Sequence, residues 1–228
     1  VMPSTTPANY LDATRGYGAE VVLMPDVRAA FAEAERLRDQ GRVLIHPFDD
    51  PLVAAGQGTI ALEILDDLPG VTHVYISIGG GGLISGMATA LRAIKPEVQI
   101  IGVETEGADT MARSLAAGRL VDLEAITSIA RTLGAPRVSD FTLDCVQRLV
   151  DEVKVVNDAD TAEALVFLLE RTKTLVEPAA SCCLVAADQH KTRFTPDDQV
   201  AILLCGGNVS VESLCEFRQL YTDKVLYD

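Results

Sequence analysis

Short apolar runs alternate with longer stretches of helical periodicity along almost the whole chain. The apolar runs predict strands at residues 20–24, 42–46, 73–78, 98–104, 153–156 and 200–205. Helical patterns cover residues 5–16, 27–40, 51–68, 83–94, 108–117, 159–172, 178–189 and 211–220. Residues 120–140 have weaker periodicity, and Gly134-Ala135-Pro136 within them is expected to form a loop. Strands that alternate with helices indicate βαβ units, so we predict an α/β fold with a doubly wound parallel sheet.

The composition fits a globular protein with a buried core, because 48% of the 228 residues are hydrophobic and 23% are charged. The 19 basic and 33 acidic residues give a net charge of −14, which argues against nucleic acid or an anionic membrane as a partner. The sequence has no apolar run long enough to span a membrane, and its five cysteines form no CxxC pair. We therefore expect a cytoplasmic protein.

Four consecutive glycines, Gly79, Gly80, Gly81 and Gly82, lie between a predicted strand and a predicted helix. Without Cβ atoms, their backbone N–H groups can approach an anion closely, and the start of the following helix adds partial positive charge. This junction predicts a phosphate site. The alternative is a simple tight turn, but such a turn needs one or two glycines rather than four.

The identity of the phosphate compound stays open on these residues alone. Gly80, Gly82 and Gly86 loosely resemble a dinucleotide-binding fingerprint, and Glu104 stands where an acid could bind a ribose. The stricter G-x-G-x-x-G spacing fails, because its third glycine would fall on Ile84 or Ser85. A nicotinamide cofactor thus remains the rival interpretation.

Three weaker motifs accompany the glycines. Cys205 and two glycines follow an apolar strand, where ligands collect in open α/β sheets, although a free cysteine is more often an inert buried thiol. Glu177 precedes a helix, where an acid is favourable without any functional role. Phe48 lies in His-Pro-Phe-Asp-Asp-Pro, whose aspartates are suited to capping the next helix.

Taken in order, the motifs resemble the serine/threonine dehydratase family of fold-type II pyridoxal-phosphate enzymes, which includes threonine dehydratase and serine racemase. The resemblance runs from Val1 to about Ser210 and rests on VMPxxTP, GAEVVL, HPFDDPxxxAGQGTIxxEI, GGGGLISG, GVE, EPAAS and CGGN. It implies pyridoxal 5′-phosphate as cofactor. The residues that it places at the cofactor are Gly79, Gly80, Gly81, Gly82 and Leu83 at the phosphate, Cys205 facing the pyridine nitrogen, and Phe48 and Glu177 near the ring.

The resemblance also implies an activity and a domain plan. Intact family members eliminate the β-hydroxyl of L-threonine or L-serine, giving a 2-keto acid and ammonia, and we expect a homodimer or homotetramer. Residues 1–47 correspond to a remnant of the small domain and residues 48–228 to the large cofactor-binding domain. Roughly 90 family residues would precede Val1, including the S-F-K-x-R-G motif with the reactive lysine. No catalytic residue is therefore predicted in this chain, and we expect it to be inactive by itself.

Other functions remain open at this point. The chain could be an inactive fragment or pseudoenzyme that only binds phosphate or the cofactor, and a racemase or a nicotinamide-dependent oxidoreductase is a further alternative. Some family members also hold a divalent cation with a Glu, a backbone carbonyl four residues later and an Asp two residues beyond that. Here Glu104 and Ala108 match that pattern, but Thr110 replaces the Asp, so the predicted cation site is incomplete.

Overall fold

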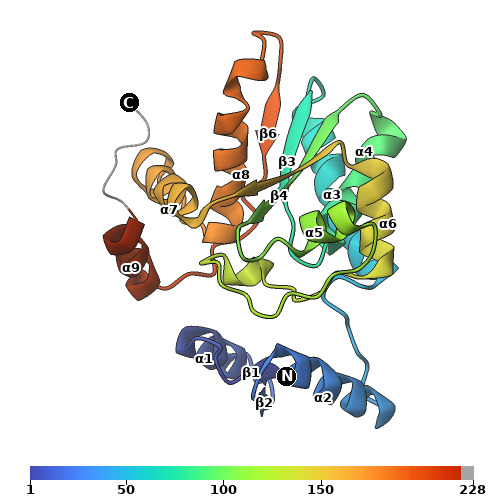
Figure 1. Cartoon of the computed structure of the whole chain (residues 1–228), viewed down its shortest axis with the longest axis vertical. Coiled ribbons are helices and arrows are strands. Elements are labelled where there is room, and N and C mark those ends of the chain that lie inside the picture. Colours follow the sequence, from blue (N-terminus) through green and yellow to red (C-terminus); the bar gives the residue numbers. More distant parts are fainter. Residues whose placement is uncertain (222–228) are drawn as a thin grey trace. The chain divides into compact units, whose positions relative to one another are not determined.

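The computed structural model describes residues 1–221 and divides the chain into two compact units, Val1–His46 and Pro47–Asp228. Figure 1 shows the helices and strands of both. The division falls one residue before the boundary expected from the sequence. Within the described residues, no helix combines the length and the apolar character that a membrane span requires.

The first unit contains two short parallel strands, β1 (Met2–Pro3) and β2 (Leu23–Met24), and two helices, α1 (Ala8–Gly16) and α2 (Val27–Asp39). Asp26 caps α2 by accepting a hydrogen bond of 2.8 Å from the N–H of Ala29.

One strand predicted in this unit is wrong. Residues 42–46 form no strand in the structure, and the side chains of Val43 and Ile45 are 90% and 75% exposed. A short apolar run makes a strand only where a neighbouring strand pairs with its backbone and an apolar face buries its side chains. Within the described residues this segment joins no sheet, and two of its three apolar residues, Val43 and Ile45, stay exposed.

The second unit is built on a four-stranded sheet in the order β5-β4-β3-β6, and all its strand pairs are parallel. The strands are β3 (His73–Ser77), β4 (Gln99–Thr105), β5 (Glu152–Val156) and β6 (Val200–Ile202). Alternate residues of β3 enter different cores: Val74 and Ile76 pack on one face of the sheet and Tyr75 on the other. The prediction of an α/β fold with a parallel sheet is confirmed.

Helices cover both faces of this sheet (Figure 1). One face is covered by α4 (Gly82–Ile94), which packs against α3 (Pro51–Asp67) and α6 (Asp140–Leu149). The other is covered by α8 (Pro178–Gln189), which packs against α7 (Asp158–Phe167). The remaining helices are α5 (Thr110–Ala117) and α9 (Val211–Tyr221), with short turns η1 (Arg131–Leu133), η2 (Leu168–Thr172) and η3 (Lys191–Arg193).

Helix α6 was not predicted. It begins with a capping box, in which the Ser139 hydroxyl accepts from the N–H of Thr142 and the Thr142 hydroxyl accepts from the N–H of Ser139, both at 3.2 Å. Such reciprocal caps usually combine Ser or Thr with Glu or Gln, so a Thr at the fourth position is a weak sequence signal.

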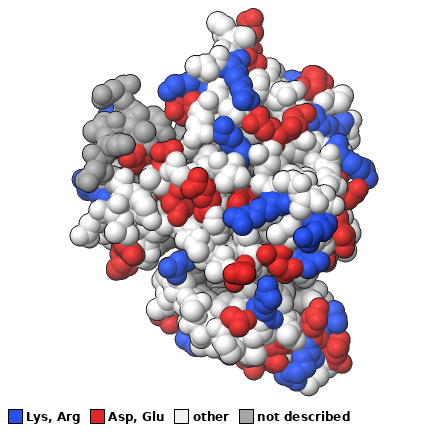
Figure 2. Space-filling model, in the orientation of Figure 1, with Lys and Arg blue, Asp and Glu red and all other residues white. Residues whose placement is uncertain are grey.

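Charged side chains of both signs are mixed on the face drawn in Figure 2. Within the second unit, charged side chains form local ion pairs, such as Arg148 with Asp144 at 3.0 Å and Arg137 with Asp122 at 2.6 Å. These pairs are about half exposed or more, so each contributes only about 0–1 kcal/mol to stability. The buried cores, rather than these pairs, hold the second unit together.

The close packing of α3 on α4 yields a test of stability. A Cβ at Gly86 would overlap the carbonyl oxygen of Ala54, whereas a Cβ at Gly56 in α3 would meet nothing within 4 Å. We expect Gly86→Ala to lower the free energy of unfolding by about 1–3 kcal/mol. The control, Gly56→Ala, should raise it by about 0.5–1 kcal/mol, because alanine favours helix. Urea denaturation measures both, and equal effects would contradict this packing.

Candidate functional site

The candidate site lies where the chain reverses its direction of travel across the sheet. From β3 the chain passes through α4 to β4 and then β5 on one side, whereas β6 pairs with the other side of β3. Ligands of open parallel sheets bind at such a point, beyond the carboxyl ends of the strands. The segments that leave β3 and β6 here are the two glycine motifs, Gly79–Gly82 and 205–207.

The first glycine motif presents backbone donors at the start of α4. Gly81 is the N-cap of this helix and has a φ of 93°, in the left-handed region that favours glycine. Within the described residues, the N–H groups from Gly79 to Leu83 have no hydrogen-bond acceptor, whereas Ile78 donates to Val103 and Ser85 to Gly81. The unpaired donors lie at the positive end of the helix and are suited to an anion.

Phe48 packs directly against this loop. A Cβ at Gly80 would overlap the Phe48 ring, and a Cβ at Gly82 would lie 2.8 Å from the Phe48 Cα. Two residues later, Asp50 caps α3 by accepting a hydrogen bond of 2.8 Å from the N–H of Leu52. The cap fixes the backbone that carries Phe48, and Phe48 in turn supports the glycine loop.

The second glycine motif brings Cys205 beside the end of β3. The Cys205 sulfur lies 3.3 Å from the Ser77 hydroxyl, and the residue remains open to solvent. Partial desolvation raises the pKa of the Cys205 thiol above its usual value, so the group is a neutral thiol at neutral pH. It can offer a weak hydrogen bond but no charge.

Glu177 lies at the N-terminus of α8, next to the second glycine motif. Its N–H donates to the Gly206 carbonyl at 3.0 Å, and its side chain is only 7% exposed. Desolvation raises the pKa of Glu177, while the Thr132 hydroxyl and the Asn208 N–H oppose that rise. The buried Oε2 atom has no hydrogen-bond partner among the described residues. Such an orphan is rare in a protein core and fits a site that a ligand completes.

Comparison with known proteins connects these features. A family model described as "Pyridoxal-phosphate dependent enzyme" matches residues 1–206. The chain belongs to this family. The family assignment from sequence is therefore confirmed, and with it pyridoxal phosphate as the family's cofactor.

Sequence identity to individual proteins supports this family assignment. The L-threonine ammonia-lyases of Geobacter sulfurreducens and Thermotoga maritima are 42% and 40% identical over 217 and 216 residues, covering 93% and 94% of this chain. The chain spans about half of these relatives, 53% of each.

Solved structures of family members superpose closely. The processed form of threonine deaminase isoform 2 from Solanum lycopersicum has a TM-score of 0.88 at 33% identity, covering 97% of this chain and 65% of that one. Maize serine racemase has a TM-score of 0.86 at 33% identity, covering 94% and 67%.

The residues present fit the phosphate of the family's cofactor. The unpaired N–H groups from Gly79 to Leu83 can receive an anion, and the orphaned Glu177 oxygen lies near the same loop. Thr132 connects them, because its side chain is near enough to Glu177 to oppose the rise in the pKa of that carboxyl, and its carbonyl oxygen would lie 3.4 Å from a Cβ at Gly79. The dinucleotide interpretation is disfavoured, because Glu104 is completely buried and cannot reach a ribose.

Of the two expected cation ligands, Glu104 and Ala108, Glu104 is already engaged by backbone donors. Both Glu104 oxygens accept backbone hydrogen bonds from the start of α5, at 2.9 Å from Met111 and 2.7 Å from Ala112. Burial raises the pKa of Glu104 to about 8. Among the described residues, no three His, Cys, Asp or Glu side chains are grouped to hold a metal ion. In this chain Glu104 caps a helix.

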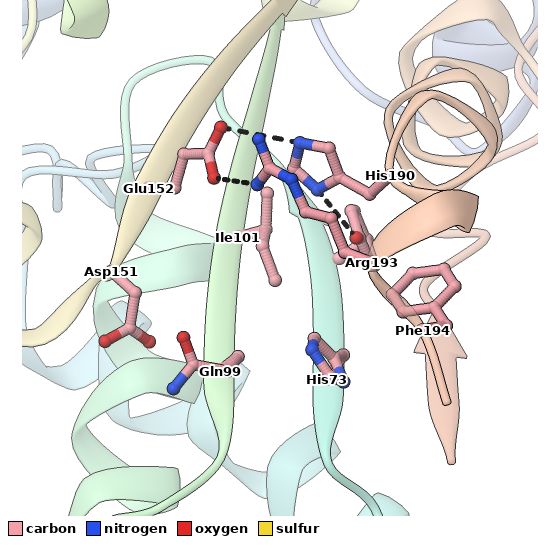
Figure 3. Close-up of a pocket in the computed structure, with 9 residues that line it drawn as sticks. His73, Gln99, Ile101, Asp151, Glu152, His190, Arg193 and Phe194 are labelled. Carbon is pink, nitrogen blue, oxygen red and sulfur yellow. Dashed lines mark hydrogen bonds and ion pairs between the residues drawn. The ribbon is translucent and has the colours of Figure 1, made fainter. Parts of the chain in front are cut away.

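A pocket of about 180 Å³ lies at the opposite, amino edge of the sheet, and its residues were not predicted (Figure 3). In it the Tyr75 hydroxyl contacts His190 Nδ1 at 2.9 Å, and His190 Nε2 lies 3.4 Å from Glu152, which also pairs with Arg193 at 3.0 Å. These residues are far apart in the sequence, so no local motif indicates them. The network joins the end of α8 to β3 and β5.

The glycine loop gives the second prediction. Gly81→Ala introduces both an unfavourable positive φ and a Cβ 2.8 Å from the Thr142 Cβ, so we expect at least a tenfold loss of pyridoxal 5′-phosphate affinity. Gly118→Ala is the matched control, since Gly118 also has a positive φ (63°) but has open space around it. Equilibrium dialysis measures both. Equal affinities in the two variants would show that the loop does not hold the phosphate.

The His190 network gives the third prediction. Burial lowers the pKa of His190 below its ordinary value of 6.5; Glu152 opposes this, whereas Arg193 and Lys154 reinforce it. A histidine whose folded-state pKa is lower takes up its proton more readily in the unfolded chain. Stability present above about pH 6.5 is therefore lost as the pH falls below that value.

We expect His190→Gln to flatten this pH dependence of the unfolding free energy between about pH 7.5 and pH 5. Urea denaturation across that range provides the measurement. His46→Gln is the control, because His46 lies in the other unit and stacks on Phe31 with ring centroids 5.4 Å apart. An unchanged slope in His190→Gln would contradict the assignment.

Proposed function

We propose that this chain forms the cofactor-phosphate-binding part of an enzyme that deaminates L-threonine or L-serine. The observation that carries the proposal is the row of unpaired N–H groups from Gly79 to Leu83 at the switch point of the sheet. Support comes from the family assignment and from relatives named L-threonine ammonia-lyase. The substrate loses its β-hydroxyl as water, and hydrolysis of the product then yields a 2-keto acid and ammonia.

Pyridoxal phosphate, when bound, supplies an electron sink for the substrate Cα. The backbone N–H groups from Gly79 to Leu83 would bind the cofactor phosphate, and Phe48 packs against the same loop. The Cys205 thiol would face the ring nitrogen and, being neutral, would offer it only a weak hydrogen bond and no charge. With such a weak partner at the ring nitrogen, the bound cofactor would be a weaker electron sink, which would suit elimination of the β-hydroxyl. Glu177 would lie near the ring, and its buried Oε2 atom would be available to bond to the ligand.

The reactive lysine is the missing part of this proposal. The S-F-K-x-R-G motif does not occur in this sequence. Three of its lysines have other partners: Lys95 donates to the Pro69 carbonyl, Lys173 to the Glu170 carbonyl and Lys191 to the Asp188 carboxylate. Lys154 belongs to β5, and Lys224 lies outside the described residues. We therefore propose that residues 1–228 bind the cofactor but do not turn over substrate by themselves.

A racemase is the second candidate, because maize serine racemase is about as similar in structure as the threonine deaminase. Both reactions remove the Cα proton of a hydroxy amino acid, and they differ in the next step. A pseudoenzyme that binds the cofactor without any turnover is the non-enzymatic alternative.

The fourth prediction separates these candidates. We expect Val1–Asp228 alone to bind pyridoxal 5′-phosphate in dialysis and to form no keto acid from L-threonine. A chimera that adds the segment preceding the matched region of the Geobacter relative should form 2-oxobutanoate, which a coupled keto-acid assay detects. The chimera with Gly81→Ala should lose this activity, whereas the chimera with Gly118→Ala should keep it. Formation of D-serine from L-serine without any keto acid would favour the racemase. A chimera that binds the cofactor but forms neither product would favour the pseudoenzyme.

A further inference from the structure

The carboxyl end of β4 carries a hydrogen-bonded cluster in which Glu104 is the central residue. Glu104 is fully buried, and its two oxygens receive the N–H groups of Met111 and Ala112 at 2.9 and 2.7 Å. Each oxygen thus has a donor from the first turn of α5. A carboxylate that bound a cation here would have to share these oxygens with both donors.

Thr110 completes the cluster in place of a carboxylate. Its hydroxyl donates to the Ala135 carbonyl at 2.7 Å, and the residue is 1% exposed. A hydroxyl has one proton to donate, and this one is directed to the protein. Asp109, the neighbouring acid, pairs through one oxygen with Arg113 at 2.9 Å, and its buried Oδ1 atom has no hydrogen-bond partner among the described residues. The carboxylate that the family pattern places at position 110 is absent, so the arrangement lacks that ligand for a hard divalent cation.

The cluster is connected to both ends of the glycine loop. Met111, whose N–H is held by Glu104, has its Cε atom 3.0 Å from the position that a Cβ at Gly81 would occupy. Ala135, held by Thr110, donates its N–H to the Leu133 carbonyl at 2.8 Å. Leu133 itself packs on the loop, because a Cβ at Gly79 would lie 3.2 Å from its Cα.

We propose that Glu104 and Thr110 are positioning residues that hold the glycine loop in shape through hydrogen bonds. They do so at the place where some family members use a divalent cation. Glu104 acts through Met111 on Gly81, and Thr110 acts through Ala135 and Leu133 on Gly79. The loop of this chain therefore keeps its shape without a cation. Its role in holding a phosphate rests on the proposed function, whereas the cation independence does not.

Restoring the missing carboxylate tests the cation part. In the absence of divalent ions, Thr110→Asp should lower the Tm, because it buries a charge beside Glu104 and Asp109. Saturating Mg²⁺, Ca²⁺ or Mn²⁺ should then raise its Tm by about 5–10 °C. The matched control, Thr110→Asn, should lose stability without any such recovery. The unaltered chain should show no shift with ions or with EDTA.

Direct Mn²⁺ binding by equilibrium dialysis is the second readout, and it needs no unfolding transition. Mn²⁺ should bind Thr110→Asp at one site and bind neither the unaltered chain nor Thr110→Asn. Saturable binding to the unaltered chain that Glu104→Gln abolishes would overturn the proposal. Absence of binding to a folded Thr110→Asp would overturn it as well.

The positioning part is tested on the loop. Glu104→Gln keeps the shape of the side chain but replaces one acceptor by an N–H₂ donor, so one helix N–H loses its partner. We expect pyridoxal 5′-phosphate to bind this variant about tenfold more weakly. Asn157→Ala removes a comparable cap from α7, where Asn157 accepts from the N–H of Asp160 at 2.8 Å, and should leave the affinity unchanged.

The two possible failures can be told apart. An unaltered chain that binds no cofactor would overturn the proposed function, while the Mn²⁺ results would still decide the cation question. Equal affinities in the unaltered chain and in Glu104→Gln would overturn the positioning role alone.

Discussion

The structure depends on one constraint, namely that the N–H groups from Gly79 to Leu83, on buried or half-buried residues at the start of α4, have no acceptor among the described residues. Leaving such donors unpaired costs free energy, so packing in the surrounding fold must offset that cost and keep the donors at the edge of the sheet, where an anion can bind them. Phe48, Thr142, Leu133 and Met111 close around the loop, and they come so near because the loop has no Cβ atoms. The glycines thus serve packing and phosphate binding with the same atoms.

The remaining motifs either support this loop or lie at the same edge of the sheet. The helix caps at Asp50 and Glu104 fix the starts of α3 and α5, and each of these starts carries or adjoins a side chain that packs on a glycine. Cys205 and Glu177 come from the far end of the chain, but the pairing of β6 with β3 brings them to the same edge. A topology in which β6 lay beyond β5 would separate the two glycine motifs.

Much of this could be predicted from the sequence, and the reasons are local. The apolar runs of β3 and β4, the capped helix after His-Pro-Phe-Asp-Asp-Pro and the glycine run each have strong short-range signals. The strand predicted at residues 42–46 was wrong, because a strand forms only by hydrogen bonding to another strand, and a local sequence pattern does not show whether such a partner is present. Helix α6 was missed because its cap uses Thr142 in an uncommon role. The part played by Glu104 also escaped, since the same spacing suits a cation ligand and a helix cap.

Helix α8 joins two places that differ in their requirements. Glu177 stands at its beginning, beside the ligand edge, and His190 lies just past its end, in the network at the amino edge. Twelve helical residues separate these edges by about 18 Å. Residues that far apart usually act additively on stability, so the amino edge can accumulate substitutions without retuning the glycine loop. Substitutions at the amino edge can therefore change the stability of the protein, whereas substitutions at the ligand edge change its chemistry.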